Sequence, residues 1–216
     1  MSVSQTHLAS LLCSRLCHDL LSPVGAMNNG LELLAEETDP EMRRRCLDLL
    51  SDSARATAQK LKYYRLAFGA AGGFDDAVDV TEAKTLVQGL MGDKASNDLQ
   101  WSVDAATLPK AAVKLLLNLA LIGQEALVRG GTLAVAAEER AGQVEIAVSA
   151  TGPKIAMDAA ILDMLAGKGG DLLENLTART AAAYLAHAIA LEGEGAIQVA
   201  ASAEQLVLGA TVNAAA

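Results

Sequence analysis

Two long runs with helical apolar spacing open this chain, and the three residues Thr38-Asp39-Pro40 separate them. The first run predicts a helix from about Ser4 to Glu36. Asp39 as N-cap and Pro40 as first helical residue then start a second helix, to about Phe68. A connection this short makes the two helices antiparallel neighbours. Their apolar stripes are too wide for one partner to cover, so we expect this hairpin to dimerise into a four-helix bundle.

The rest of the chain mixes helix and strand patterns. Ala70–Gly73 resembles a linker, which predicts a hairpin domain over residues 1–70 and a second domain over 74–216. Strands grouped with helices on one face make an α+β sandwich. The predicted helices are Thr81–Met91 with a Thr cap, Leu108–Val128, Asp158–Leu165 and Leu172–Leu191, and the predicted strands are Leu99–Val103, Thr132–Ala137, Val144–Ala150, Ala196–Ala200 and Leu206–Val212.

Composition limits where such a protein works and what it binds. No apolar stretch approaches the roughly 18 residues of a membrane span, and the first residues lack the basic region of a secretory signal. The three cysteines are an odd number, which favours free thiols in a reducing compartment. Residues 1–67 are neutral overall, so residues 68–216 carry the whole net charge of −9, a poor surface for nucleic acid. We expect a cytoplasmic protein that binds neither membrane nor nucleic acid.

One unusual segment lies within the first run, Cys17-His18-Asp19-Leu20-Leu21-Ser22-Pro23. With the apolar residues facing inward, His18 falls on a polar stripe and is exposed; a neutral imidazole there is a nucleophile near pH 7. Pro23 disturbs the preceding turn, which carries His18. Asp19 either orients the imidazole or is a solvated charge, and Ser22 either steers an incoming group or is a permissive surface residue. The stripe comprises His7, Ser14, Arg15, His18, Ser22, Gly25, Asn29, Glu32 and Glu36.

Other histidines and cysteines are better explained by structure than by chemistry. Cys13 and Cys17 lie on the apolar side of the helix while His18 points about 100° away, so we expect buried, inert thiols rather than a metal site. His7 and His187 lack partners and are expected to be structural. The run Arg43-Arg44-Arg45 is expected to be a solvated face, with contact to an acidic partner as the alternative.

The segment His18-Asp19-Leu20-Leu21-Ser22-Pro23 resembles the H-box of sensor histidine kinases, His-Glu-Leu-x-Thr-Pro, whose histidine is phosphorylated. The fuller run from Leu11 to Met27 is similar to the ChpT-type histidine phosphotransferases of bacteria. That resemblance implies an H-box hairpin joined to a degenerate kinase-like ATP-binding domain.

The second domain departs from a kinase domain at three boxes. In Asn118–Ala126 the first asparagine of the N-box is present, but Ile122 replaces the second. Ala150 stands where an aspartate would bind adenine, and only Gly152 of the following glycines is kept. Asn175–Thr180 offers no glycine for a lid. We therefore expect a nucleotide-binding fold that no longer binds nucleotide, and a protein with no cofactor of its own.

These observations predict a homodimeric histidine phosphotransferase of a two-component phosphorelay rather than an ATP-dependent kinase. The resemblance implies that His18 accepts a phosphoryl group from the receiver domain of a hybrid histidine kinase, which supplies Mg²⁺, and passes it to response-regulator receivers. Leu12, Leu16 and Leu20 are expected to contact the receiver, with Arg15 at the rim. The alternatives are an ATP-dependent autokinase with a divergent nucleotide site and a non-catalytic dimeric scaffold.

Overall fold

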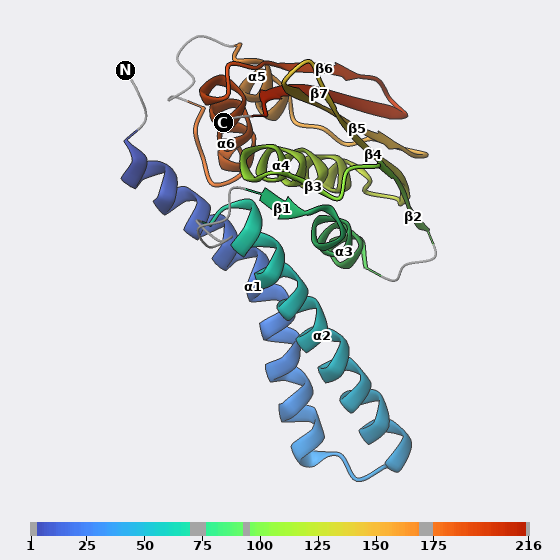
Figure 1. Cartoon of the computed structure of the whole chain (residues 1–216). Coiled ribbons are helices and arrows are strands. Elements are labelled where there is room, and N and C mark those ends of the chain that lie inside the picture. Colours follow the sequence, from blue (N-terminus) through green and yellow to red (C-terminus); the bar gives the residue numbers. More distant parts are fainter. Residues whose placement is uncertain (1–3, 70–76, 93–95, 169–174, 215–216) are drawn as a thin grey trace.

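The computed structural model describes residues 4–69, 77–92, 96–168 and 175–214. A long helical hairpin at the N-terminus projects from an α/β layer structure (Figure 1). The predicted α+β class, with an N-terminal hairpin before a sandwich, is confirmed. The predicted boundary between residues 70 and 74 lies outside the described residues.

The hairpin consists of α1 (Gln5–Glu36) and α2 (Pro40–Ala67). The side chain of Ser4 caps α1 by accepting from the N–H of His7. Asp39 caps α2 by accepting from the two backbone amides that follow Pro40, which occupies the first helical position as predicted. Both helices end within a residue of the predicted bounds. Gly30 lets them approach closely, because an added Cβ would lie 3.1 Å from a methyl carbon of Leu50.

A five-stranded sheet in the order β2-β4-β5-β7-β6 forms the second domain. β2 and β4 pair in parallel, and the other neighbours are antiparallel. Alternate residues of the central strands, such as Val135, Val148 and Leu208, point into the core. The strands are β2 (Asn97–Val103), β4 (Gly131–Arg140), β5 (Gln143–Thr151), β6 (Ile197–Ala201) and β7 (Gln205–Asn213).

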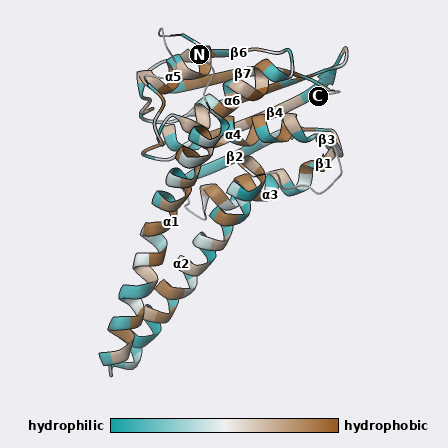
Figure 2. Cartoon of the chain, turned by 90° about the vertical axis from the view of Figure 1, so that its left-hand side faces the viewer, coloured by the Kyte–Doolittle hydropathy of each residue, from teal (hydrophilic) through white to brown (hydrophobic). Residues whose placement is uncertain are grey.

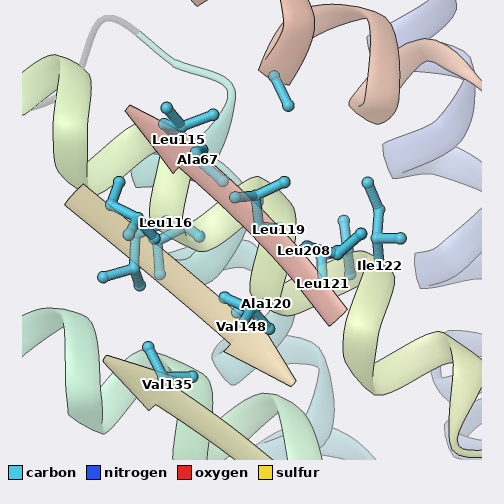
Figure 3. Close-up of a cluster of buried hydrophobic side chains, with 14 of the residues drawn as sticks. Ala67, Leu115, Leu116, Leu119, Ala120, Leu121, Ile122, Val135, Val148 and Leu208 are labelled. Atoms are coloured by element: carbon cyan, nitrogen blue, oxygen red, sulfur yellow. The ribbon is translucent and has the colours of Figure 1, made fainter. Parts of the chain in front are cut away.

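One face of the sheet is covered by helices (Figure 1). α4 (Lys110–Ala126) is almost wholly buried, with Leu115, Leu116 and Leu119 packed against the strands (Figure 3). The remaining elements are α3 (Val80–Met91), α5 (Ala159–Ala166), α6 (Ala181–Glu192) and a small antiparallel pair, β1 (Ala77–Asp79) and β3 (Thr107–Pro109).

The upper part of the hairpin packs tightly on this domain. α1 contacts α6, and α2 contacts α3 and α4. Tyr63 is fully buried, and its hydroxyl donates to the backbone oxygen of Leu117 in α4. The side-chain amide of Asn118 donates to the backbone oxygen of Ala67 at 3.1 Å. The upper end of the hairpin is therefore held against the second domain, while the lower end stands free (Figure 1).

Three local predictions need correction. The last long helix begins at Ala181 rather than at residue 172, and residues 172–174 are outside the described ranges. The hydroxyl of Thr180 donates to the backbone oxygen of Asn175 and accepts from the N–H of Thr177. These hydrogen bonds favour a turn over a helix before residue 181. Asp79, not Thr81, caps α3. Cys13 and Cys17 are exposed rather than buried, and Cys13 borders an open groove between α1 and α2.

Candidate phosphotransfer site

His18 is the most exposed part of the site. Its side chain is 84% accessible, as the helical stripe predicted. The ring nitrogen Nδ1 lies 3.2 Å from Oδ1 of Asp19. Because a carboxylate only accepts hydrogen bonds, this contact favours the tautomer with the proton on Nδ1. The other nitrogen, Nε2, then carries the lone pair of a nucleophile.

The two oxygens of Asp19 have different partners. Oδ1 faces the imidazole of His18, whereas Oδ2 accepts from Nε of Arg15 at 2.8 Å and from the hydroxyl of Tyr64 at 2.5 Å. The Asp19 side chain is only 17% exposed. Burial alone would raise the pKa of this carboxyl, but the hydrogen bonds from Tyr64 and Arg15 and the Arg15 charge lower it below its usual value. Asp19 is thus an ionised group in a fixed orientation.

Pro23 explains a further contact to the same residue. Proline has no N–H, so the backbone oxygen four residues earlier, that of Asp19, loses its helical partner. The Nζ of Lys60 in α2 donates to this oxygen at 2.9 Å. The main chain of Asp19 is therefore held from α2 by Lys60, and its side chain by Tyr64 of the same helix.

Arg15 is buried, which corrects its predicted place at an exposed rim. Its guanidinium donates to two helices and to the turn before α6. Nε donates to Asp19 one turn along α1, Nη2 donates to Oε1 of Glu125 near the end of α4, and Nη1 donates to the backbone oxygen of Arg179 at 3.3 Å. Burial acts to lower the pKa of Arg15, but the carboxylates of Glu125 and Asp19 outweigh it and raise that pKa. The residue joins the H-box helix to the sheet domain.

The other predicted site residues are divided between two sides of α1. Ser22 is exposed one turn beyond His18. Leu12 is buried, contrary to the exposure expected of a receiver contact, while Leu16 and Leu20 are partly buried. Leu12 and Leu16 line a groove with Leu61 and Phe68 of α2, so their side of the hairpin is not the side of His18.

Sequence reasoning missed Lys60, Tyr64 and Glu125. Tyr64 is buried among the apolar residues of α2, but its hydroxyl donates to Oδ2 of Asp19. A signal for Lys60 was present, since Pro23 implies an unpaired backbone oxygen at residue 19 that needs a donor. The pairing of Glu125 with Arg15 joins residues 110 positions apart, and helix periodicity alone does not reveal it.

The residues at the positions compared with the kinase nucleotide boxes are buried in the core. Asn118 is fully buried, and its amide nitrogen donates to the backbone oxygens of Ala67 and Lys114. Ile122 and Ala150 are buried as well. None of the helices in the described ranges is both long and apolar enough to cross a bilayer. Nor do His, Cys, Asp or Glu side chains of those ranges gather in threes or more where a metal ion could be held.

Comparison with known proteins places this geometry in a family. The sequence model described as "Histidine phosphotransferase C-terminal domain" matches residues 80–205, more than half of the chain. The Protein phosphotransferase ChpT of Brucella abortus (strain 2308) is 35% identical over 210 residues, 97% of this chain and 98% of that protein. The chain belongs to the histidine phosphotransferase family. Its function is histidine phosphotransfer in a phosphorelay, and its partners are phosphorelay proteins.

A solved structure of similar sequence agrees with the assignment. A structure described as "1.7 Angstrom Structure of a Bacterial Phosphotransferase" matches with a TM-score of 0.83 and 34% identity, over 97% of this chain and 98% of that chain. The Acinetobacter baumannii histidine kinase AdeS also matches, with a TM-score of 0.48 and 12% identity, over 91% of this chain and 98% of that one.

Proposed function

We propose that this histidine phosphotransferase accepts a phosphoryl group on Nε2 of His18 from the aspartyl phosphate of a receiver domain and passes it to the aspartate of a second receiver. The observation that carries the proposal is the exposed imidazole of His18, whose Nδ1 lies against the half-buried, oriented carboxylate of Asp19. The resemblance to ChpT-type proteins supports a hybrid kinase receiver as donor and response regulators as acceptors.

In this reaction the main task of the chain is to position the imidazole of His18 for attack on phosphorus. The Nε2 lone pair attacks phosphorus, the Nε2–P bond forms, and the P–O bond to the donor aspartate breaks as that carboxylate leaves. The imidazole gains positive charge in this step, and the hydrogen bond from Nδ1–H to the Asp19 carboxylate therefore becomes stronger. The receiver supplies Mg²⁺, which neutralises the phosphoryl oxygens.

We place the receiver on the side of the hairpin that bears Ser22. Ser22, Pro23 and Ala26 line a groove of about 360 Å³ together with residues of α2 that include Asp52 and Lys60. Ser22 lies one helical turn from His18, so a receiver in this groove would bring its aspartate near the imidazole. This proposal replaces the buried Leu12 and Arg15 as contact residues.

The opposite side of the hairpin is proposed to bind a second copy of the chain. Leu20, Val24 and Leu31 recur on one face of α1, and Leu47, Ala54 and Leu61 recur on one face of α2. Leu61 and Leu16 border the same groove, so these two faces lie on one side of the hairpin. Val24, Leu31, Leu47 and Leu61 are exposed in the single chain, and Figure 2 shows hydrophobic positions along both helices. Two-fold pairing of this hairpin face would complete a four-helix bundle.

A labelling experiment tests the proposed function against autokinase and scaffold activity. The purified protein is mixed with a ³²P-labelled receiver in Mg²⁺ or with [γ-³²P]ATP in Mg²⁺, and label on the protein is counted. The proposal predicts label from the receiver and none from ATP, because the buried Asn118, Ile122 and Ala150 offer no ligands to a nucleotide. Millimolar ATP with Mg²⁺ is likewise expected to leave the melting temperature unchanged. Label from ATP would indicate an autokinase, and label from neither source a scaffold.

A further inference from the structure

The sheet domain contributes a carboxylate to the H-box through Glu125. This residue lies near the end of α4, and its Oε1 accepts from Nη2 of Arg15, while Nε of Arg15 donates to Asp19. These three side chains border the junction of hairpin and sheet domain, and a cleft of about 540 Å³ there is lined by Asp19, Lys60, Tyr64 and Glu125 among others. A continuous chain of contacts therefore runs from α4 to the imidazole of His18.

The ion pair between Glu125 and Arg15 affects how much of the Asp19 charge acts on the imidazole of His18. The positive charge of Arg15 is shared between the carboxylates of Asp19 and Glu125; burial raises the pKa of Glu125, and the Arg15 charge opposes that shift. Without Glu125, the buried guanidinium of Arg15 would be neutralised by Asp19 alone. Less of the Asp19 charge would then be available to hold Nδ1–H and to stabilise the positive ring that forms on phosphorylation.

We propose that Glu125 is a positioning residue for phosphoryl transfer: it binds Arg15 from the sheet domain and leaves Oδ1 of Asp19 free to orient the imidazole of His18. This inference rests on the proposed role of His18. It assigns the degenerate nucleotide domain a part in the transfer site that requires no nucleotide. Tyr64 acts in the same direction, because its hydroxyl helps to hold Oδ2 of Asp19 away from the ring.

Phosphoramidate is the probe that separates this role from receiver docking, since a small donor needs no protein surface. Its protonated nitrogen leaves as ammonia when the P–N bond breaks and the Nε2–P bond forms. The other imidazole proton stays on Nδ1, hydrogen-bonded to Asp19. The rate of His18 phosphorylation is measured on the full chain. The tautomer of His18 is measured in the same samples by ¹⁵N NMR of the imidazole.

The test variant is Glu125→Gln, which keeps the size of the side chain and an oxygen that can accept from Arg15. We expect phosphorylation about tenfold slower, by analogy with the loss of a residue that orients a metal-binding histidine, and a smaller population of the Nδ1–H tautomer. Tyr64→Phe, which removes one hydroxyl, should move both readouts in the same direction. Glu41→Gln is the matched control, because Glu41 pairs with Arg45 at the exposed far end of the hairpin; it should change neither readout.

A double variant tests the coupling itself. Once Arg15 is replaced in Arg15→Met, Glu125→Gln should slow phosphorylation no further, because Glu125 acts through Arg15. Equal rates and tautomer ratios for Glu125→Gln and the unaltered protein would overturn the proposal, as would additive losses in the double variant. If the unaltered protein takes no phosphate on His18 from either phosphoramidate or a receiver, the proposed function itself fails.

Discussion

The carboxylate of Asp19 binds the imidazole of His18 with one oxygen and the interior of the protein with the other. Oδ1 lies 3.2 Å from Nδ1 of His18, and Oδ2 lies 2.8 Å from Nε of Arg15. The exposed imidazole of His18 is thus anchored, through Asp19, to the buried side chains of Arg15 and Tyr64. Of the two roles that the sequence leaves open for Asp19, this arrangement favours the orienting one, which stays a prediction.

The contact between His18 and Asp19 predicts which nitrogen is phosphorylated. Nδ1 donates to the carboxylate, so phosphate should be found on Nε2. NMR of the ¹⁵N-labelled phosphoprotein distinguishes the two isomers through the nitrogen that couples to phosphorus. Phosphate on Nδ1 would show that the hydrogen bond to Asp19 is broken in the reacting state.

The pairing of Pro23 with Lys60 predicts a coupled effect on stability. Lys60→Met should lower the free energy of unfolding by about 1 kcal/mol, because the backbone oxygen of Asp19 loses its donor. Pro23→Ala restores a backbone N–H to that oxygen, so the same lysine change should cost little in the Pro23→Ala background. Urea denaturation of the four proteins measures both costs.

The control for this cycle is Lys62→Met, which alters an exposed lysine two residues along α2. It should have little effect in either background. An equal cost of Lys60→Met with proline or alanine at position 23 would mean that Lys60 does not replace the missing helical donor.

The lowered pKa of Asp19 predicts that its contribution to stability depends on pH. In an unfolded chain the aspartate pKa is about 3.9, and the folded value is lower. The stabilisation is therefore complete above about pH 3.9 and is lost as the pH falls through the folded pKa. Asp19→Asn should reduce the free energy of unfolding by about 1–3 kcal/mol at pH 7, and the difference from the unaltered protein should shrink near pH 3.

Thermal or urea unfolding of both proteins between pH 7 and pH 3 measures this difference. Asp48→Asn, at an exposed position of α2, serves as the matched change and should have little effect at any pH. A difference between the Asp19 variant and the unaltered protein that stays constant across the range would refute the ionised, hydrogen-bonded carboxylate.

The proposed dimer face predicts different outcomes for two nearby leucines. Leu31 is 55% exposed and Leu33 is 60% exposed in the single chain. The two leucines nevertheless point to nearly opposite sides of α1, about 160° apart. Light scattering should give twice the 22.3 kDa chain mass for the unaltered protein. Leu31→Glu would bury a charge in the interface and should give the monomer mass, whereas Leu33→Glu should remain dimeric. A monomeric unaltered protein, or a dimeric Leu31→Glu protein, would contradict the bundle.

Much of the fold follows from local patterns in the sequence. The hairpin was predictable within a residue because strong signals agree: apolar spacing, an Asp cap and a proline at the first position of α2. The sheet strands are recognisable from alternation of apolar and polar residues, and α4 from a strongly apolar sequence. The helix before residue 181 was overpredicted, since Thr177 and Thr180 use their hydroxyls on the backbone and form a turn instead.

The site was predictable only where it is local. His18, Asp19 and Pro23 are neighbours in sequence, and exposure of His18 followed from the helical stripe. Arg15 lies on that same stripe but is buried, because the sheet domain covers this part of α1. Its partners Glu125 and Arg179 are brought in by the tertiary fold, and a single helix pattern carries no information about them.

The central claim is that His18 is the residue that accepts phosphate, and the most direct measurement is label transfer to a His18→Asn protein. Because the His18 side chain is exposed, this variant should keep the melting temperature of the unaltered protein. The account predicts that a ³²P-labelled receiver transfers label to the unaltered protein and none to the His18→Asn protein. Label on a folded His18→Asn protein would place the acceptor elsewhere in the chain.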